Sequence, residues 1–306
     1  MSNAKVPHVP ASEAVIGEPT TIGERIVLAE DGGAAGRAAV RWVTERLGRR
    51  PADVRVIGTV ARADDAAAVA DSWKTVDRAT DVLHTVAPNA SVAADVVVGD
   101  PEESLRAEAE AADLLVIGLS ETDVGEHDSL PVRLAGRATC VVVIVPADWA
   151  PAHGGTVVGV SIDTASDAAL EFAANHARRE GAPLHLVHAW NLPATGELPF
   201  PEDRTDESIP DVQRHALEAF AAGVRTADLE VTSAARQGSP AEVLWSAAGE
   251  ADLLVVGRRT RRPLARLLLG SVSRALAEDP PCPIAVVPQP RTPLQVVKND
   301  RRDSGL

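Results

Sequence analysis

The run Gly270-Ser271-Val272-Ser273 combines the residue types that can hold an anion at the start of a helix. Glycine leaves the backbone open, and serine hydroxyls donate hydrogen bonds. The first turn of a helix adds unpaired N–H groups and the positive end of the helix dipole. A phosphate group can be held in this way without the lysine of a Walker motif. The run therefore predicts an anion site at the start of a helix near residue 270.

An arginine-rich stretch lies just before this run, and its members are Arg258, Arg259, Arg261, Arg262 and Arg266. Because guanidinium groups pair well with phosphate oxygens, the stretch could screen the charge of a bound phosphate. A solvated arginine loop explains the same residues, and the sequence leaves both interpretations open.

Other chemistry is poorly supported by the residue pattern. Cys140 and Cys282 stand far apart without ligand-spaced partners, and each precedes a β-branched run, so we expect small buried hydrophobes. His176 and His188 lie in a helical and an apolar stretch, where structural roles are expected. The sequence contains neither the Gly-x-Ser-x-Gly elbow of a hydrolase nor the Gly-x-Gly-x-x-Gly of a dinucleotide site. No catalytic residue and no resident metal site are predicted.

Composition narrows the class of protein further. The chain has 306 residues and a formal net charge of −14, which would repel nucleic acid and anionic membranes. No run approaches the roughly 18 apolar residues of a membrane-spanning helix, and no signal segment follows Met1, so a cytoplasmic protein is expected. Apolar residues make up 45% of the chain and are mainly aliphatic, and the length suggests two cores.

The elements that would position these residues occur twice. The segment from Asp113 to Gly118 reappears from Asp252 to Gly257 at an offset of 139. The offset is 130 at the first elements, where Ala38-Ala39 matches Ala168-Ala169, and 142 at the last, where Val145 matches Val287. The differences in offset place the insertions in loops.

Short apolar runs alternate with longer helical stretches in both halves, which predicts parallel sheets covered on both faces. Strands are expected near 25–29, 54–60, 92–98, 113–117 and 141–145, and near 156–160, 184–189, 229–235, 252–256 and 283–287. Long helices are expected over about 64–87 and 208–226, and Pro101 and Pro240 fit the first turn of a helix.

Three segments are predicted to lack regular structure. Residues 1–22 and 290–306 show no periodicity and are interpreted as mobile tails. The Pro-rich, acidic segment 191–211 is interpreted as a solvated insertion, with a lid as the alternative.

A set of motifs runs through the second half. Its members are Val157-Val158-Gly159-Val160, Leu253 to Gly257 and, most specifically, Leu268 to Ser273 followed by Pro281 to Val287. In these motifs the second half resembles the universal stress protein family. The first half is similar in layout and keeps Asp31-Gly32 after its first strand.

The resemblance implies an α/β fold of two doubly wound five-stranded parallel sheets, each with the strand order 3-2-1-4-5. The two units would form an internal pseudo-dimer, usually through their last strands, with domains at residues 24–147 and 155–288. It further implies a regulatory role in stress adaptation rather than a defined reaction, with ATP bound in some members.

The family's ATP pattern is Gly, two residues, Gly, nine residues, then Gly followed by Ser or Thr. This chain has Gly257, Thr260 and Gly270-Ser271 at those positions, so one glycine is replaced by a β-branched residue. The family's nucleotide-contacting Asp aligns with Ser161, and Ala189 matches a position whose backbone commonly meets adenine. The predicted site comprises Ser161, Asp163, Ala189, Gly257, Arg258, Thr260, Gly270, Ser271, Val272 and Ser273.

The first half departs from this pattern, with Glu121 and Pro131-Val132 where the second glycine and the Gly-Ser pair would stand. Glu121, Asp123, Glu126 and Asp128 add negative charge where phosphate would lie. We therefore predict a degenerate site without nucleotide in this half.

Three functions remain open. The first is a regulatory module that binds ATP or another adenine nucleotide in its second half and then changes its contacts with a protein partner or a further copy. The second is a nucleotide-free scaffold that acts through dimerisation and protein contacts. The third is an ATP-hydrolysing enzyme, for which Asp163 alone is placed to act as base or Mg²⁺ ligand.

Overall fold

Strands form where short runs of Val, Ile and Leu can bury both faces of a parallel sheet, and helices fill the longer stretches between them. The computed structural model describes residues 4–5, 23–162, 167–191, 208–258 and 269–289. The first half contains β1 (Ala4–Lys5), β2 (Glu24–Ala29), α1 (Ala34–Leu47), β3 (Ala52–Val60), α2 (Ala66–Val86), β4 (Ala90–Val98), α3 (Pro101–Glu108), η1 (Ala109–Ala111), β5 (Leu114–Leu119), α4 (Leu130–Arg137) and β6 (Val141–Pro146). The second contains β7 (Thr156–Gly159), α5 (Asp167–Glu180), β8 (Leu184–Trp190), α6 (Ile209–Val224), β9 (Val231–Gln237), α7 (Pro240–Ala247), β10 (Leu253–Gly257), α8 (Ser271–Glu278) and β11 (Ile284–Val287).

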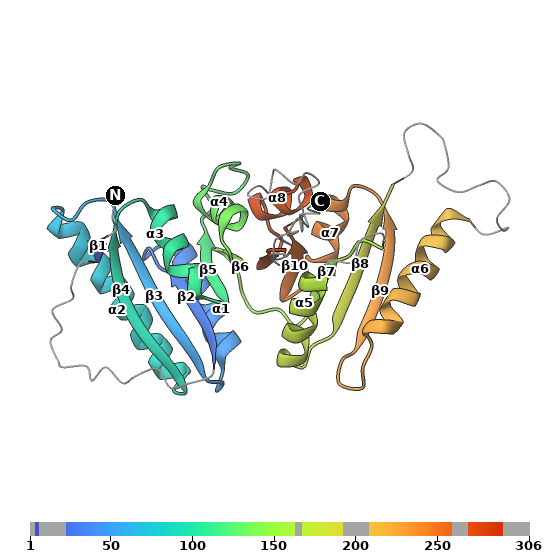
Figure 1. The fold of residues 1–306 in the computed structure, drawn as a ribbon, viewed down its shortest axis with the longest axis horizontal. Coiled ribbons are helices and arrows are strands. Elements are labelled where there is room, and N and C mark those ends of the chain that lie inside the picture. Colours follow the sequence, from blue (N-terminus) through green and yellow to red (C-terminus); the bar gives the residue numbers. More distant parts are fainter. Residues whose placement is uncertain (1–3, 6–22, 163–166, 192–207, 259–268, 290–306) are drawn as a thin grey trace, which may run out of the picture.

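The described strands form one eleven-stranded sheet with the order β1-β4-β3-β2-β5-β6-β11-β10-β7-β8-β9. Each half contributes five parallel strands with its first strand in the middle, which confirms the predicted order 3-2-1-4-5. β6 and β11 pair antiparallel, with Val143 opposite Ala285, and so join the halves side by side (Figure 1). The predicted internal pseudo-dimer through the last strands is thus confirmed.

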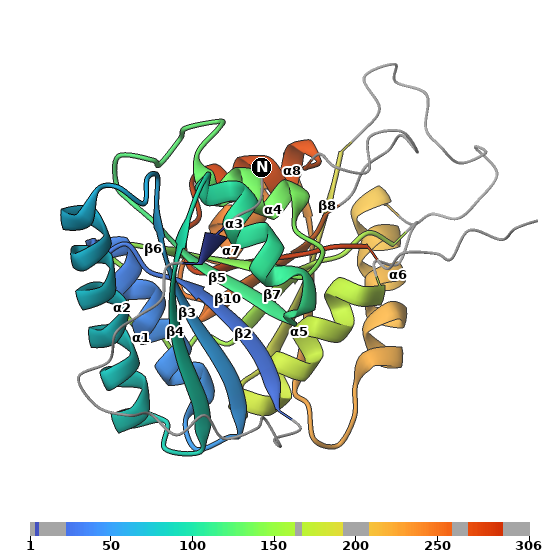
Figure 2. The ribbon, with the colours of Figure 1, turned by 60° about the vertical axis from the view of Figure 1, so that its left-hand side comes forward.

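Helices lie on both faces of this sheet (Figure 2), and an apolar cluster is buried on each face. Helices α1, α2, α5 and α6 cover one face, and α3, α4, α7 and α8 cover the other. Each cluster contains residues of both halves, so the two clusters correspond to the two faces of the sheet and not to the two halves of the chain. The reason is the β6–β11 pairing, which makes the sheet continuous and lets each face be buried as a unit.

The expected helix starts are also present. Pro101 and Pro240 each occupy the first position of a helix, where proline loses no hydrogen bond. The Asp100 side chain caps α3 by accepting from the Glu103 N–H at 3.0 Å. The predicted long helices correspond to α2 and α6.

Two expectations about irregular segments need correction. Ala4 and Lys5, in the predicted tail, pair antiparallel with Val98 and Val97 at the edge strand β4, because an open sheet edge offers unpaired backbone groups. α6 begins at Ile209, so the end of the predicted insertion is helical. Residues 1–3, 6–22, 192–207 and 290–306 lie outside the described part of the chain.

Both cysteines are buried, at 8% exposure for Cys140 and 5% for Cys282. Burial raises the pKa of the Cys140 thiol to about 11 and that of Cys282 to about 12. These thiols are therefore protonated at neutral pH and pack as small hydrophobes, as predicted. Over the described ranges no helix combines the length and the apolar character needed to cross a bilayer.

Candidate functional site

The crevice of the second half lies where β7 and β10 end side by side. The two strands are parallel neighbours, with Leu253 opposite Thr156 and Val255 opposite Val158. β7 is followed by β8 on one side and β10 by β11 on the other, so the strand order reverses here. Ligands of open parallel sheets bind beyond the carboxyl ends of the strands at such a point.

Several predicted residues meet at this edge of the sheet. Ser161 follows β7 and Gly257 closes β10, and both are half-buried. Because β11 runs parallel to β10, the intervening α8 must run back across the sheet, so Gly270 at its start lies at the same carboxyl edge. Asp163 and Thr260 lie outside the described residues.

The start of α8 has an open backbone. Gly270 occupies the N-cap position in an extended conformation (φ −66°, ψ 160°) and provides no side-chain cap. Ser271 is exposed, whereas Ser273 is buried and its hydroxyl donates to the Gly270 carbonyl at 3.2 Å. Only the Ser271 hydroxyl therefore faces solvent, next to the N–H groups of Ser271, Val272 and Ser273 that a helix leaves without an internal acceptor.

Arg258 makes a contact that its sequence position did not reveal. Its Nη1 donates to the Gly136 carbonyl at 3.1 Å and to the Ala138 carbonyl at 2.7 Å, at the C-terminal end of α4 in the first half. A cation there satisfies carbonyls that the helix leaves free and complements the helix dipole. Burial lowers the pKa of the guanidinium from its usual value. Arg258 thus ties the two halves together.

Ala189 lies in β8 and is half-buried beside the carboxyl end of β7. Its neighbour His188 is buried, and Nδ1 donates to the Val160 carbonyl at 3.0 Å. The ring is therefore held as the Nδ1-protonated tautomer, because a carbonyl can only accept. This contact agrees with the predicted structural role and fixes the backbone directly before Ser161.

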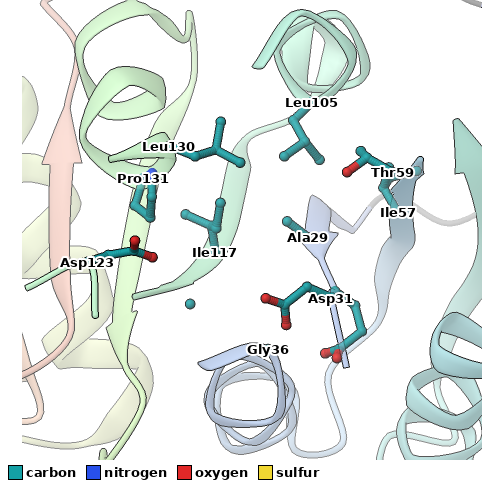
Figure 3. Close-up of a pocket in the computed structure, with 12 residues that line it drawn as sticks. Ala29, Asp31, Gly36, Ile57, Thr59, Leu105, Ile117, Asp123, Leu130 and Pro131 are labelled. Atoms are coloured by element: carbon teal, nitrogen blue, oxygen red, sulfur yellow. The ribbon is translucent and has the colours of Figure 1, made fainter. Parts of the chain in front are cut away.

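The first half has a cavity of about 110 Å³ at the corresponding crevice, between the carboxyl ends of β2 and β5 (Figure 3). Its apolar lining comprises Ala29, Ile57, Leu105, Ile117, Leu130 and Pro131, and its polar lining Glu30, Asp31, Thr59 and Asp123. Sequence reasoning identified Asp31 and Asp123 here but missed Glu30. The sequence could have identified Glu30 as a candidate, because it is the first polar residue after the buried strand β2.

Glu30 is a buried carboxylate, with 7% of its surface exposed. Its Oε1 accepts from the Gly32 N–H at 2.7 Å, whereas its buried Oε2 has no hydrogen-bond partner within the described structure. Asp31, beside it, accepts from the Gly33 N–H at 2.8 Å. Burial raises the pKa of Glu30 to about 7, and the charge of Asp31 adds to this effect.

Within the described residues, no group of three or more His, Cys, Asp or Glu side chains is placed to hold a metal ion.

Comparison with known proteins bears on both halves. Residues 156–288 match the model of the universal stress protein family. A universal stress protein of Mycobacterium tuberculosis H37Rv is 30% identical over 211 residues, which span 65% of this chain and 70% of that protein. One from Mycolicibacterium smegmatis is 28% identical over 294 residues, 86% of this chain and 96% of the relative.

Solved structures show the same fold. The crystal structure of a universal stress protein from Archaeoglobus fulgidus covers 88% of this chain with all of its own length, at a TM-score of 0.60 and 17% identity. The relatives are named as stress proteins and not for a reaction, in agreement with the prediction of a non-enzyme. With both the sequence relatives and the family model in agreement, this chain belongs to the universal stress protein family.

Proposed function

We propose that the protein is a cytoplasmic regulatory module of stress adaptation that binds ATP or another adenine nucleotide in its second half, residues 155–288. The observation that carries this proposal is the open N-terminus of α8 at the strand-order reversal between β7 and β10. Such a terminus favours a phosphate group through its free N–H groups and its dipole. The first half, residues 24–147, is proposed to bind no nucleotide.

The phosphate groups would lie against Gly270, Ser271 and the backbone of Val272 and Ser273, with Gly257 leaving room at the end of β10. The exposed Ser271 hydroxyl is the side chain best placed to donate to a phosphate oxygen. The buried Ser273 hydroxyl donates to the helix backbone instead, so its contribution would be limited to its N–H.

The nucleoside would lie toward β7 and β8. Ser161 offers a hydroxyl for the ribose or the base, and the Ala189 backbone lies beside the base. Asp163 and Thr260 complete the proposed site, with Asp163 as the candidate ligand for Mg²⁺ that accompanies ATP. The Arg258 side chain would form one side of the crevice, while its guanidinium stays hydrogen-bonded to the carbonyls at the end of α4.

Calorimetric titration of the whole chain with ATP and Mg²⁺ tests this proposal. Gly270→Asp adds a negative charge where the phosphate would lie, and Asp is a good N-cap, so the helix should stay folded. Gly270→Asn supplies a neutral cap of the same shape. We expect about one nucleotide per chain, with affinity reduced at least ten-fold by Gly270→Asp and less by Gly270→Asn.

Ser239→Asp is the matched control, because Ser239 is the exposed N-cap of α7 in the same half. It adds the same charge to another helix start and should leave the affinity unchanged. Equal losses in Gly270→Asp and Ser239→Asp would mean that overall charge, and not the α8 terminus, governs binding.

A nucleotide-free scaffold is the second candidate function, and the contact of Arg258 with α4 favours it. A guanidinium held by two carbonyls of the other half serves the pseudo-dimer rather than a ligand. Absence of both heat and thermal stabilisation at millimolar ATP would support this function. Regulation would then rest on contacts with a protein partner or a second copy of the chain.

A further inference from the structure

The first-half cavity combines carboxylates with apolar walls, and its described lining contains no basic residue. Glu30 lines the cavity, and its buried Oε2 has no hydrogen-bond partner among the described residues. A buried carboxylate oxygen without a partner is costly, so its position indicates a donor that comes from a ligand. We propose that this cavity binds a small organic cation, an ammonium group on a short aliphatic body, with Glu30 and Asp31 as its counter-ions.

The backbone brings the two carboxylates together over the first turn of α1. A side chain at Gly36 would collide with them, because its Cβ would lie 2.6 Å from Oε1 of Glu30 and 2.7 Å from Oδ1 of Asp31. Glycine at this position therefore lets both acids approach the helix. Two like charges held so close repel one another, and a cation between them would relieve that repulsion.

A third acid faces this pair across the cavity. Figure 3 shows Asp123 on the opposite side from Asp31, beyond Ile117. Oδ2 of Asp123 accepts from the Ser120 hydroxyl at 2.6 Å, which holds the side chain in the loop after β5. The polar end of a ligand would thus meet negative charge from both sides.

The remaining lining accounts for the aliphatic body. Ile57, Leu105, Ile117 and Leu130 present hydrocarbon above the carboxylates. An apolar protein cavity of about 150 Å³ accommodates benzene, so a cavity of about 110 Å³ has room for about four to five non-hydrogen atoms. An ammonium group on a four-carbon chain has that size, whereas a nucleotide is far larger.

Ionisation of Glu30 makes binding depend on pH. Burial and the charge of Asp31 raise the pKa of the Glu30 carboxyl to about 7, although the charges of Arg37 and Arg78 act to lower it. An alkylammonium ion keeps its charge throughout this range. Affinity should therefore rise about ten-fold between pH 5.5 and pH 8, as Glu30 becomes charged.

Calorimetry of the full chain with n-butylammonium chloride, at constant total chloride, tests the proposal. At pH 8 we expect saturable binding and a rise in Tm, neither of which 1-butanol should produce. Glu30→Gln keeps the shape and the bond to Gly32 but removes the charge, and should weaken binding at least ten-fold. Glu121→Gln removes an exposed acid outside the lining and should bind like the wild type.

Glu30→Gln should remain folded, because it removes a buried charge, and its Tm without ligand verifies this. Equal binding to the wild type and Glu30→Gln would overturn the proposal, as would equal effects of butanol and butylammonium. A rise in Tm with calcium chloride but not with butylammonium would also contradict it, because the site would then prefer a metal ion. None of these outcomes depends on nucleotide binding in the second half.

Discussion

Nη1 of Arg46 lies 2.8 Å from Nδ1 of His176, and the two residues are counterparts in the internal repeat, 130 positions apart. The offset is the one that relates Ala38 to Ala168. A guanidinium can only donate, so His176 accepts through Nδ1 and carries its proton on Nε2. Counterparts that touch one another must lie at the pseudo-twofold axis, which therefore passes between α1 and α5.

The sheet gives the same axis independently. Val143 pairs with Ala285, and their separation of 142 is the repeat offset that relates Val145 to Val287. On one side of the sheet, Arg50 and Glu180, again 130 apart, form an ion pair at 3.3 Å. In a symmetric dimer of one half, Arg46 and Arg50 would each meet its own copy. In the tandem chain each arginine instead meets a residue of complementary character, because Arg46 contacts His176 and Arg50 contacts Glu180.

Replacement of Arg46 by Met should destabilise the protein by about 3 kcal/mol. Arg46 is 3% exposed and donates to Glu24 at 3.0 and 2.8 Å as well as contacting His176. Glu24 keeps a second partner, Arg179, at 3.0 and 3.3 Å, which limits the loss. Urea unfolding measures the change. Arg49→Met, at an exposed position, should cost far less, and similar losses in both variants would deny Arg46 this role.

Acid should weaken the contact between the halves through His176. Burial, assisted by the charge of Arg50, lowers the pKa of His176 to about 4. The unfolded chain takes up this proton near pH 6.5 and the folded chain near pH 4. The contribution of neutral His176 to the free energy of unfolding is thus complete above pH 6.5. It is lost as the pH falls toward 4, by about 3 kcal/mol in total.

His176→Gln keeps an acceptor for Arg46 and removes the titration. Unfolding free energies of the wild type and this variant, measured from pH 4 to 7.5, should therefore diverge as the pH falls, with the wild type losing more. His84→Gln, on the exposed side of α2, supplies the control. Parallel curves for wild type and His176→Gln would show that His176 does not titrate in this window.

Charge reversal tests the complementarity of Arg50 and Glu180. The side chains are 44% and 30% exposed, so each single reversal, Arg50→Glu or Glu180→Arg, should cost only about 0.5 to 1 kcal/mol. The double variant should regain most of this loss, because the two charges still oppose one another. A double-mutant cycle of denaturation midpoints supplies the coupling energy. Strictly additive losses would mean that the pair does not stabilise the interface.

Glu30→Gln should stabilise the unliganded protein in neutral and basic solution. The folded pKa of Glu30 is about 7, above the unfolded value of 4.5, so its ionisation opposes folding. The wild type has its full stability below pH 4.5, where Glu30 is protonated in both the folded and the unfolded chain. Its free energy of unfolding falls by up to about 3 kcal/mol as the pH rises toward 7. The variant should thus exceed the wild type above pH 7 and match it below pH 4.5. An unchanged difference across this range would contradict the buried charge.

Local patterns made much of this fold predictable from sequence. The apolar runs and the Pro101 and Pro240 helix starts specify strands and helices by themselves, and the repeat offsets specify two equivalent halves. The offset of 142 identifies Ala285 as the counterpart of Val143, and the structure places these two residues opposite one another where β6 meets β11. These features depend on neighbours in sequence or on symmetry.

Contacts across the halves were not predictable in the same way. Arg258 looked like a phosphate ligand in an arginine run, but its guanidinium reaches carbonyls 120 and 122 residues away. The unpaired oxygen of Glu30 likewise follows from the packing of α1 against β2, to which Gly36 contributes by lacking a side chain. Such roles depend on three-dimensional neighbours that one sequence does not reveal.

Hydrogen exchange of the full chain with and without ATP and Mg²⁺ tests the central proposal most directly. We predict that ATP slows exchange at Ser271, Val272 and Ser273, because their N–H groups would bind phosphate. The start of α4, residues 130–132 in the first half, should be unaffected. Unchanged exchange at the α8 start with saturating ATP, or equal protection of both helix starts, would contradict a nucleotide site confined to the second half.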